Sequence, residues 1–96
     1  MRTKLTDGEV QAALKTLPGW GLESGAIAKT YKFPKFADGI AFVQRVAKAA
    51  DAMDHHPDID IRYTKIRVAL STHDAGGITA MDTKLAAQIE ALSGAT

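Results

Sequence analysis

The three histidines of this 96-residue chain are its strongest candidates for chemistry. His55 and His56 are adjacent and precede Pro57, and His73 follows seventeen residues after His56. An imidazole has an unperturbed pKa of about 6.5, so it can donate or accept a proton near neutral pH. If the fold gathers these side chains, they can carry proton-transfer chemistry.

The segment between the histidines predicts a β-hairpin that would bring two of them together. Apolar and polar residues alternate over 58–71, as expected of two strands that share one buried face. If Thr64 and Lys65 form a two-residue turn, the same register continued outward places His56 opposite His73. Directly opposed strand residues have Cβ atoms about 5 Å apart. We therefore expect His56 and His73 to meet at one end of this hairpin.

His55 is expected at the end of a helix that precedes the hairpin. Pro57 disfavours helical geometry at His56, so the helix must stop near residue 54. Asp51 stands four residues before His55, one helical turn away on the same side. The ending of the helix frees His55 and His56 from regular geometry, so their adjacent side chains can converge.

Two other interpretations of these residues stay open. A histidine pair before a proline in a loop is more often solvated or structural than catalytic. Three histidines with Asp51 or Asp82 also offer suitable ligand atoms for zinc or iron. The spacing disfavours a metal, because the chain has no helical His-x-x-x-His pair and two of the ligands are adjacent in sequence. Asp82 also fits a capping box with Thr79, which explains it structurally.

The remaining patterns predict an α+β fold of order α-β-β-α-β-β-α, in a single domain over residues 1–96. Hairpins make the four-stranded sheet antiparallel, and one apolar face per strand lets the three helices cover one face of it. Tyr63 falls on this apolar strand face, where we expect it to pack. Helices are predicted at 6–17, 36–54 and 79–92, and strands at 20–23, 26–33 and as two runs within 58–71.

The composition excludes several classes of protein. The formal charge of +1 gives no field that would favour nucleic acid or an anionic membrane. Without cysteine the chain has no disulfides, thiol nucleophile or cysteine-bound zinc. There is no hydrophobic signal region and no apolar run near the roughly 20 residues that span a bilayer. We expect a soluble, cytoplasmic protein.

The pattern of chemical residues resembles that of the pterin-4a-carbinolamine dehydratases. That family has an acidic residue, three spacers, His-His-Pro, five or six spacers, an aromatic residue, nine spacers, a histidine, and then an aspartate further on. The segments "LPGW" and "LSTHDAGGITAMD" are also similar to the family. One departure is at position 51, where many members carry glutamate. The matching residues here are Asp51, His55, His56, Pro57, Tyr63, His73 and Asp82.

The resemblance implies both a fold and a reaction. The implied fold is a four-stranded antiparallel sheet with three helices on one face. The implied reaction removes water from 4a-hydroxytetrahydropterin to give quinonoid dihydropterin, which recycles tetrahydrobiopterin after aromatic amino-acid hydroxylation. It requires no metal and no organic cofactor.

The resemblance also implies roles for individual residues. His55 and His73 are the candidate acids for the departing hydroxyl, and His56 is a substrate ligand and candidate base. Asp51 would orient His55, and Asp82 would position a neighbouring group. Pro57 and Tyr63 complete the set that would bind or orient the pterin.

The resemblance leaves the partners partly open. It implies a homodimer or homotetramer that acts on a small pterin and shares a pathway with a pterin-dependent hydroxylase, without direct contact to nucleic acid or membrane. Some members also act as a dimerisation cofactor for a homeodomain transcription factor. A role with another pterin, as in molybdopterin metabolism, is a third interpretation.

Overall fold

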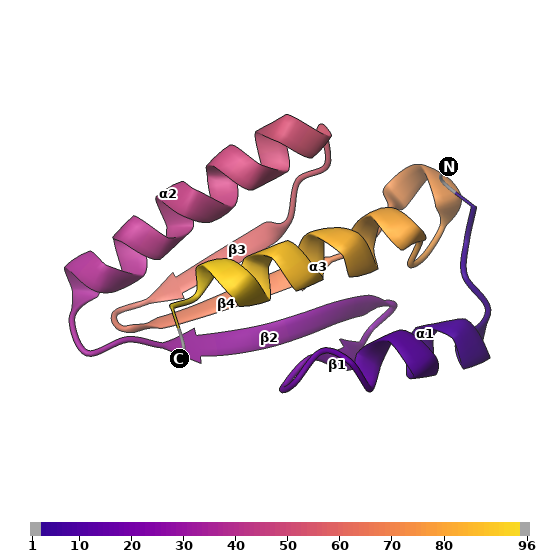
Figure 1. The fold of residues 1–96 in the computed structure, drawn as a ribbon, viewed down its shortest axis with the longest axis horizontal. Coiled ribbons are helices and arrows are strands. Elements are labelled where there is room, and N and C mark those ends of the chain that lie inside the picture. The colour runs from indigo at the N-terminus through magenta and orange to yellow at the C-terminus, as the bar shows by residue number, and fades with distance from the viewer. Residues whose placement is uncertain (1–2, 95–96) are drawn as a thin grey trace.

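The computed structural model describes residues 3–94, and its elements follow the predicted order (Figure 1). One four-stranded antiparallel sheet has the strand order β1-β2-β4-β3, so β1 and β3 are its edges. The α+β prediction is confirmed. The elements are α1 (Asp7–Leu14), β1 (Gly21–Glu23), β2 (Ala26–Lys32), α2 (Phe36–Met53), β3 (Asp58–Arg62), β4 (Lys65–Leu70), the short 3₁₀ helix η1 (His73–Ala75) and α3 (Ala80–Leu92).

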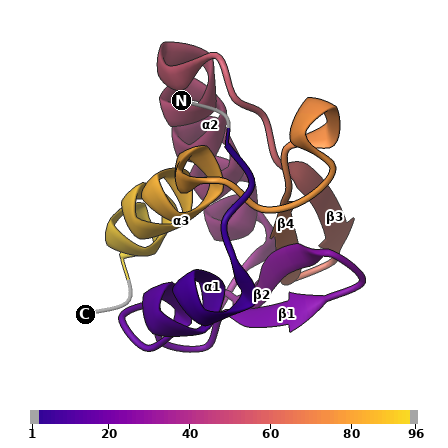
Figure 2. The ribbon, with the colours of Figure 1, turned by 90° about the vertical axis from the view of Figure 1, so that its right-hand side faces the viewer.

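The three helices cover one face of the sheet, as expected from the alternation of apolar residues (Figures 1 and 2). The core lies between them, and its largest fully buried side chains include Phe42 of α2, Ile66 of β4 and Leu85 of α3. The opposite face carries charged residues such as Arg67, which forms an ion pair with Glu23. Within residues 3–94, no helix is long and apolar enough to cross a bilayer.

Local sequence signals set the ends of the helices. The predicted capping boxes are present at both α1 and α3, where Thr6 pairs with Glu9 and Thr79 pairs with Asp82. The first helix is shorter than predicted, because it ends at Leu14 and the chain reaches the buried Leu17 through a turn. Helix ends commonly tighten or fray in this way.

The turn between β3 and β4 differs from the prediction. Tyr63 and Thr64 form the turn, with Arg62 opposite Lys65 and Ile61 opposite Ile66. The predicted register was wrong by two residues, a shift that keeps every side chain on the same face of the sheet and so is not excluded by hydrophobic alternation. Continued outward, the observed register no longer places position 56 opposite position 73.

Tyr63 does not pack on the apolar face, so that prediction was also wrong. It lies in the turn with a φ of 54°. Its side chain is 73% exposed.

The carboxylate of Glu90 joins α3 to β2 at a distance from the histidines. Its Oε1 accepts hydrogen bonds from Tyr31 Oη at 2.6 Å, Lys29 Nζ at 2.8 Å and Trp20 Nε1 at 3.3 Å. Burial alone would raise the pKa of Glu90, but the hydrogen bonds from Lys29 and Tyr31 and the charge of Lys29 lower it overall. Burial and the bond to Glu90 both raise the pKa of Tyr31. The ionised Glu90 therefore stabilises the folded chain.

We expect Glu90→Gln to lower the free energy of unfolding by about 1–2 kcal/mol at neutral pH, the range for hydrogen bonds to a charged group. A depressed pKa gives stability that is present above the unfolded-state pKa and is lost as the pH falls through the folded-state pKa. The difference between wild type and variant should thus be full at pH 7 and shrink below the unfolded-state value of 4.5. Urea denaturation at pH 7 and pH 3 measures it. Glu23→Gln, at an exposed ion pair, is the control. An equal difference at both pH values would contradict the prediction.

Candidate functional site

All three histidines line one open pocket at the end of the sheet where α2 ends and β4 ends. The pocket has a volume of about 330 Å³. His55 and His56 come from the segment between α2 and β3, and His73 begins η1, directly after β4. The lining residues are Asp54, His55, His56, Ser71, Thr72, His73 and Asp74.

His73 reaches the pocket by a route that the strand register did not predict. The chain leaves β4 and turns back on itself, because Thr72 N donates to Gly77 O at 2.8 Å and Gly77 N donates to Thr72 O at 3.3 Å. The turn closes at Gly76, whose φ of 73° suits glycine. This closed loop holds η1, and with it His73, beside the end of α2.

The end of α2 fixes the position of His55. Asp54 adopts a left-handed conformation with φ 50°, and its N–H donates to Asp51 O at 3.1 Å. His55 N donates to Ala50 O at 3.1 Å. These two bonds form the Schellman pattern that ends many helices. It turns the His55 side chain inward, where only 5% of it is exposed.

His55 forms a buried pair with Asp82 from the first turn of α3. His55 Nε2 lies 2.5 Å from Asp82 Oδ1. The other carboxylate oxygen, Oδ2, accepts hydrogen bonds from Thr72 Oγ1 and Thr79 N, each at 2.9 Å. Asp82 is fully buried, and every hydrogen bond to it comes from a donor that the fold holds in place.

With Asp82 taken as an ionised carboxylate, its hydrogen bonds assign the protons of this network. Thr72 Oγ1 donates its proton to Asp82, so Thr79 Oγ1 must donate to Thr72 across their 2.8 Å contact. This carboxylate accepts hydrogen bonds from Thr72 and Thr79 and has no proton of its own to donate. Its hydrogen bond with His55 therefore requires a proton on Nε2 of the histidine. Nδ1 is then the ring nitrogen left for a ligand. It can accept a proton when the ring is neutral and donate one when the ring is charged.

Asp51 pairs with His56 and not with His55, contrary to the expected orienting role. His56 Nε2 lies 2.9 Å from Asp51 Oδ1. Both side chains are exposed, His56 by 57% and Asp51 by 77%. Because His55 turns inward at the helix end, its carboxylate partner comes from α3. The first histidine is therefore held rigidly in the core, and the second is held loosely at the surface.

Four residues of the expected site do not line the pocket: Asp51 and Asp82, which each hold a pocket histidine, and Pro57 and Tyr63, which hold none. Pro57 is half-buried and leads directly into β3. Tyr63 lies at the turn after β3, whereas the histidines lie before β3 and after β4, so the length of the hairpin separates them.

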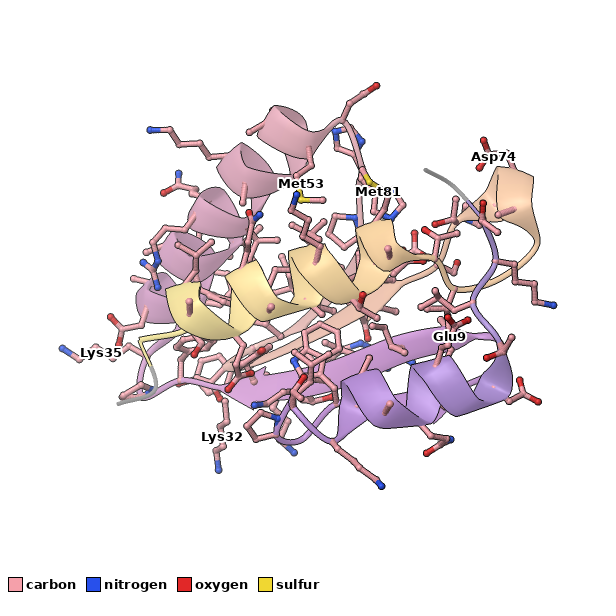
Figure 3. All side chains as sticks on the ribbon, turned by 45° about the vertical axis from the view of Figure 1, so that its right-hand side comes forward. Glu9, Lys32, Lys35, Met53, Asp74 and Met81 are labelled. Carbon is pink, nitrogen blue, oxygen red and sulfur yellow. The ribbon has the colours of Figure 1, made fainter. Side chains whose placement is uncertain are left out.

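Four pocket residues were missed by the sequence reasoning, namely Asp54, Ser71, Thr72 and Asp74. Thr72 and Asp74 flank His73, and Asp54 precedes His55, so adjacency to the histidines was the available signal. Figure 3 shows Asp74 on η1, and Met53 and Met81 between the end of α2 and the start of α3.

The other interpretation of the histidines was a metal centre, and the residues that the structure describes offer no set of ligands for one. Within residues 3–94, no group of three or more His, Cys, Asp or Glu side chains is placed to hold a metal ion. Asp82 and Asp51 each hold a different histidine.

Comparisons with known proteins give a consistent result over nearly the whole chain. The family model for Pterin 4 alpha carbinolamine dehydratase matches residues 3–92. A protein of Roseiflexus sp. (strain RS-1) is 49% identical over 94% of this chain and 97% of its own length. A protein of Mycolicibacterium smegmatis is 52% identical over 88% of this chain and 90% of its own length. Both are provisionally named pterin-4-alpha-carbinolamine dehydratase.

A solved structure has the same fold. The crystal structure of a transcriptional coactivator/pterin dehydratase from Brucella melitensis superposes with a TM-score of 0.92 and 34% sequence identity. The match covers 96% of this chain and all of the Brucella chain.

Proposed function

This chain belongs to the pterin 4 alpha carbinolamine dehydratase family, and from that premise we propose that it removes water from 4a-hydroxytetrahydropterin to give quinonoid dihydropterin. One observation supports this function above the others. His55, backed by the buried Asp82, lines the same pocket as His56 and His73.

The reaction needs two proton transfers, which three imidazoles can supply. The C4a–O bond breaks, and the hydroxyl leaves as water after it takes a proton. The electron pair of N5 forms the C4a–N5 double bond, and N5 loses its proton. An acid must therefore reach the hydroxyl and a base must reach N5, and a positioned group of either kind contributes about 10²–10⁴-fold to a rate.

We assign these roles from the surroundings of each histidine. His55 lines the pocket while Asp82 holds its Nε2, so Nδ1 is the nitrogen left to donate a proton from the charged form, and the carboxylate stabilises that charge. His73 is the second acid, because it lines the pocket from η1. His56 is more exposed and is held by Asp51, which suits a substrate ligand that also accepts the N5 proton.

A stopped-flow assay with chemically generated 4a-hydroxytetrahydropterin tests this function directly. We expect the protein to accelerate dehydration at concentrations far below that of the pterin, and His56→Ala to raise KM more than it lowers kcat. Asp60→Asn, on the open face of the sheet away from the pocket, is the matched control. Folded protein that leaves the spontaneous rate unchanged would overturn the proposal.

The physiological setting is also a proposal. We propose that the substrate is 4a-hydroxytetrahydrobiopterin, so that the protein recycles tetrahydrobiopterin beside a pterin-dependent hydroxylase. Assays that compare biopterin with other pterins distinguish this setting from one in molybdopterin metabolism.

A protein-binding function is the second candidate, because the Brucella relative is described as a transcriptional coactivator as well as a pterin dehydratase. The surface between α2 and α3 offers a shallow apolar depression in which Arg45 and Lys48 border Ala49, Ala52 and Leu92. Binding there would not need the histidines. Variants of His55 and His73 that lose dehydration but keep a partner would separate the two functions.

A further inference from the structure

The capping box of α3 differs from that of α1 in what it holds. In α1 the box of Thr6 and Glu9 is exposed, and its hydrogen bonds serve only the start of the helix. In α3 the box of Thr79 and Asp82 is fully buried, and Asp82 uses its other oxygen to hold His55. The start of α3 therefore supports a residue of the pocket as well as a helix.

The hydroxyl of Thr72 lies inside this buried cluster. Thr72 is 1% exposed, and its Oγ1 lies 2.8 Å from Thr79 Oγ1 and 2.9 Å from Asp82 Oδ2. It precedes η1, but its side chain makes no capping bond there. Valine would fill the same space without the cost of burying a hydroxyl. Packing alone therefore does not account for a threonine at this position.

The protons of the two hydroxyls point in one direction, from α3 toward the carboxylate. Thr79 Oγ1 accepts a hydrogen bond from Met81 N at 3.2 Å, which leaves its own proton for Thr72. Thr72 in turn donates to Asp82. A hydroxyl that accepts one hydrogen bond becomes a stronger donor in the next. The contact from Thr79 therefore both orients the hydroxyl of Thr72 and strengthens its bond to the carboxylate.

This bond limits how strongly Asp82 holds the proton of His55. Thr72 Oγ1 and Thr79 N both donate to Asp82 Oδ2 and draw negative charge toward that oxygen. Hydrogen bonds to the charged form of a carboxylate lower its affinity for a further proton. Without Thr72, Oδ1 would carry more of the charge and would hold the Nε2 proton more tightly. A charged ring that is held more tightly is a poorer acid at Nδ1.

We propose that Thr72 is a positioning residue for the dehydration, whose hydroxyl, oriented by Thr79, sets the strength of the hydrogen bond between Asp82 and His55. This inference rests on the proposed dehydratase function for the role of His55, and on the buried contacts for the network. The single hydroxyl proton of Thr72 goes to Asp82, so its side chain cannot also donate to the substrate.

Valine at position 72 removes the hydroxyl at nearly constant shape. We expect Thr72→Val to lower kcat by roughly two- to tenfold, the change that corresponds to one net hydrogen bond, and to leave KM near its wild-type value. Thr72→Ser, which keeps the hydroxyl, should recover most of the lost rate. Thr79→Val removes the donor that orients Thr72 and should also lower kcat, so it tests the same network if Thr72→Val does not fold.

Thr6→Val is the matched control, because it removes the hydroxyl of the other capping box, which has no link to the histidines. It should leave kcat unchanged. A raised KM with an unchanged kcat in Thr72→Val would mean that the hydroxyl binds the substrate directly, and the proposal would be wrong.

Proton NMR of the free protein tests the network without any activity measurement. The proton between His55 Nε2 and Asp82 Oδ1, which are 2.5 Å apart, should resonate downfield of the backbone amides, and nitrogen-15 labelling of histidine identifies it. We expect this resonance to move further downfield in Thr72→Val and to stay in place in Thr6→Val. An unchanged resonance in folded Thr72→Val would overturn the inference even if wild-type protein dehydrates the pterin. If wild type is inactive but the resonance moves, the proposed function fails and the network stands.

Discussion

Replacing both His55 and His73 with glutamine is expected to lower the dehydration rate by about 10²–10⁴-fold, the usual contribution of a positioned acid. Each single change should cost only about tenfold, because both side chains line the same pocket and the remaining acid can still protonate the hydroxyl. The double change should therefore cost more free energy than the two single changes added together. Stopped-flow rates for wild type, the two single variants and the double variant measure this coupling.

Glutamine is the better replacement at position 55 because of the buried carboxylate behind it. Alanine would leave Asp82 without its partner in the core, and a lone buried charge strongly destabilises a protein. The glutamine amide can still donate to Asp82 but cannot transfer a proton. Thermal unfolding of each variant serves as the control for folding. A folded double variant with near-native rates would show that the histidines are structural, and the dehydratase proposal would then be wrong.

Asp82→Asn should reduce activity by about as much as the single change of His55, through a different cause. Thr79 N and Thr72 Oγ1 both donate to Asp82 Oδ2, so the new amide must keep its oxygen on that side. Its NH₂ group then faces His55 Nε2, which can no longer carry a proton there. The neutral ring must move its proton to Nδ1, and the charged ring that acts as the acid loses the carboxylate that stabilises it. We expect kcat to fall by about tenfold, as for the single His55 change, because His73 can still protonate the hydroxyl, and the free energy of unfolding to fall by about 1–3 kcal/mol.

Asp51→Asn is the matched comparison for this change. It also removes a carboxylate from a histidine, but that pair is exposed, so its effect on stability should stay within about 0.5 kcal/mol. Nitrogen NMR of the imidazoles reports the tautomer of His55 directly. If Asp82→Asn leaves the proton on Nε2 and the rate unchanged, Asp82 acts only as the cap of α3.

The sequence alone determined the elements and their buried faces, because these depend on signals that lie close together in the chain. The capping boxes at Thr6 and Thr79 involve residues three positions apart, and both are present as predicted. The alternation of apolar residues over β3 and β4 fixed which side of the sheet the helices cover. The spacing of the histidines and their flanking residues also indicated the family, which the comparisons confirm.

Local signals did not determine the hairpin register. A shift of two residues leaves every side chain on the same face, so burial cannot distinguish the two pairings. The turn contains Tyr63 and Thr64, and neither is a residue that usually marks a left-handed turn position. His73 joins the other histidines because a closed loop and η1 follow β4, not because it lies opposite His56.

The tertiary structure alone decided which carboxylate serves which histidine. Asp51 is four residues from His55 in the chain, yet His55 pairs with Asp82, twenty-seven residues away. Proximity in a helix favours the near partner only while the helix continues, and α2 ends between Asp51 and His55 with a left-handed residue that turns the ring into the core. In the core, the ring of His55 meets the carboxylate of Asp82, which lies in the first turn of α3. The packing of α3 against the sheet holds that carboxylate beside the ring. Since that contact depends on how distant elements pack, no spacing within the sequence could have predicted it.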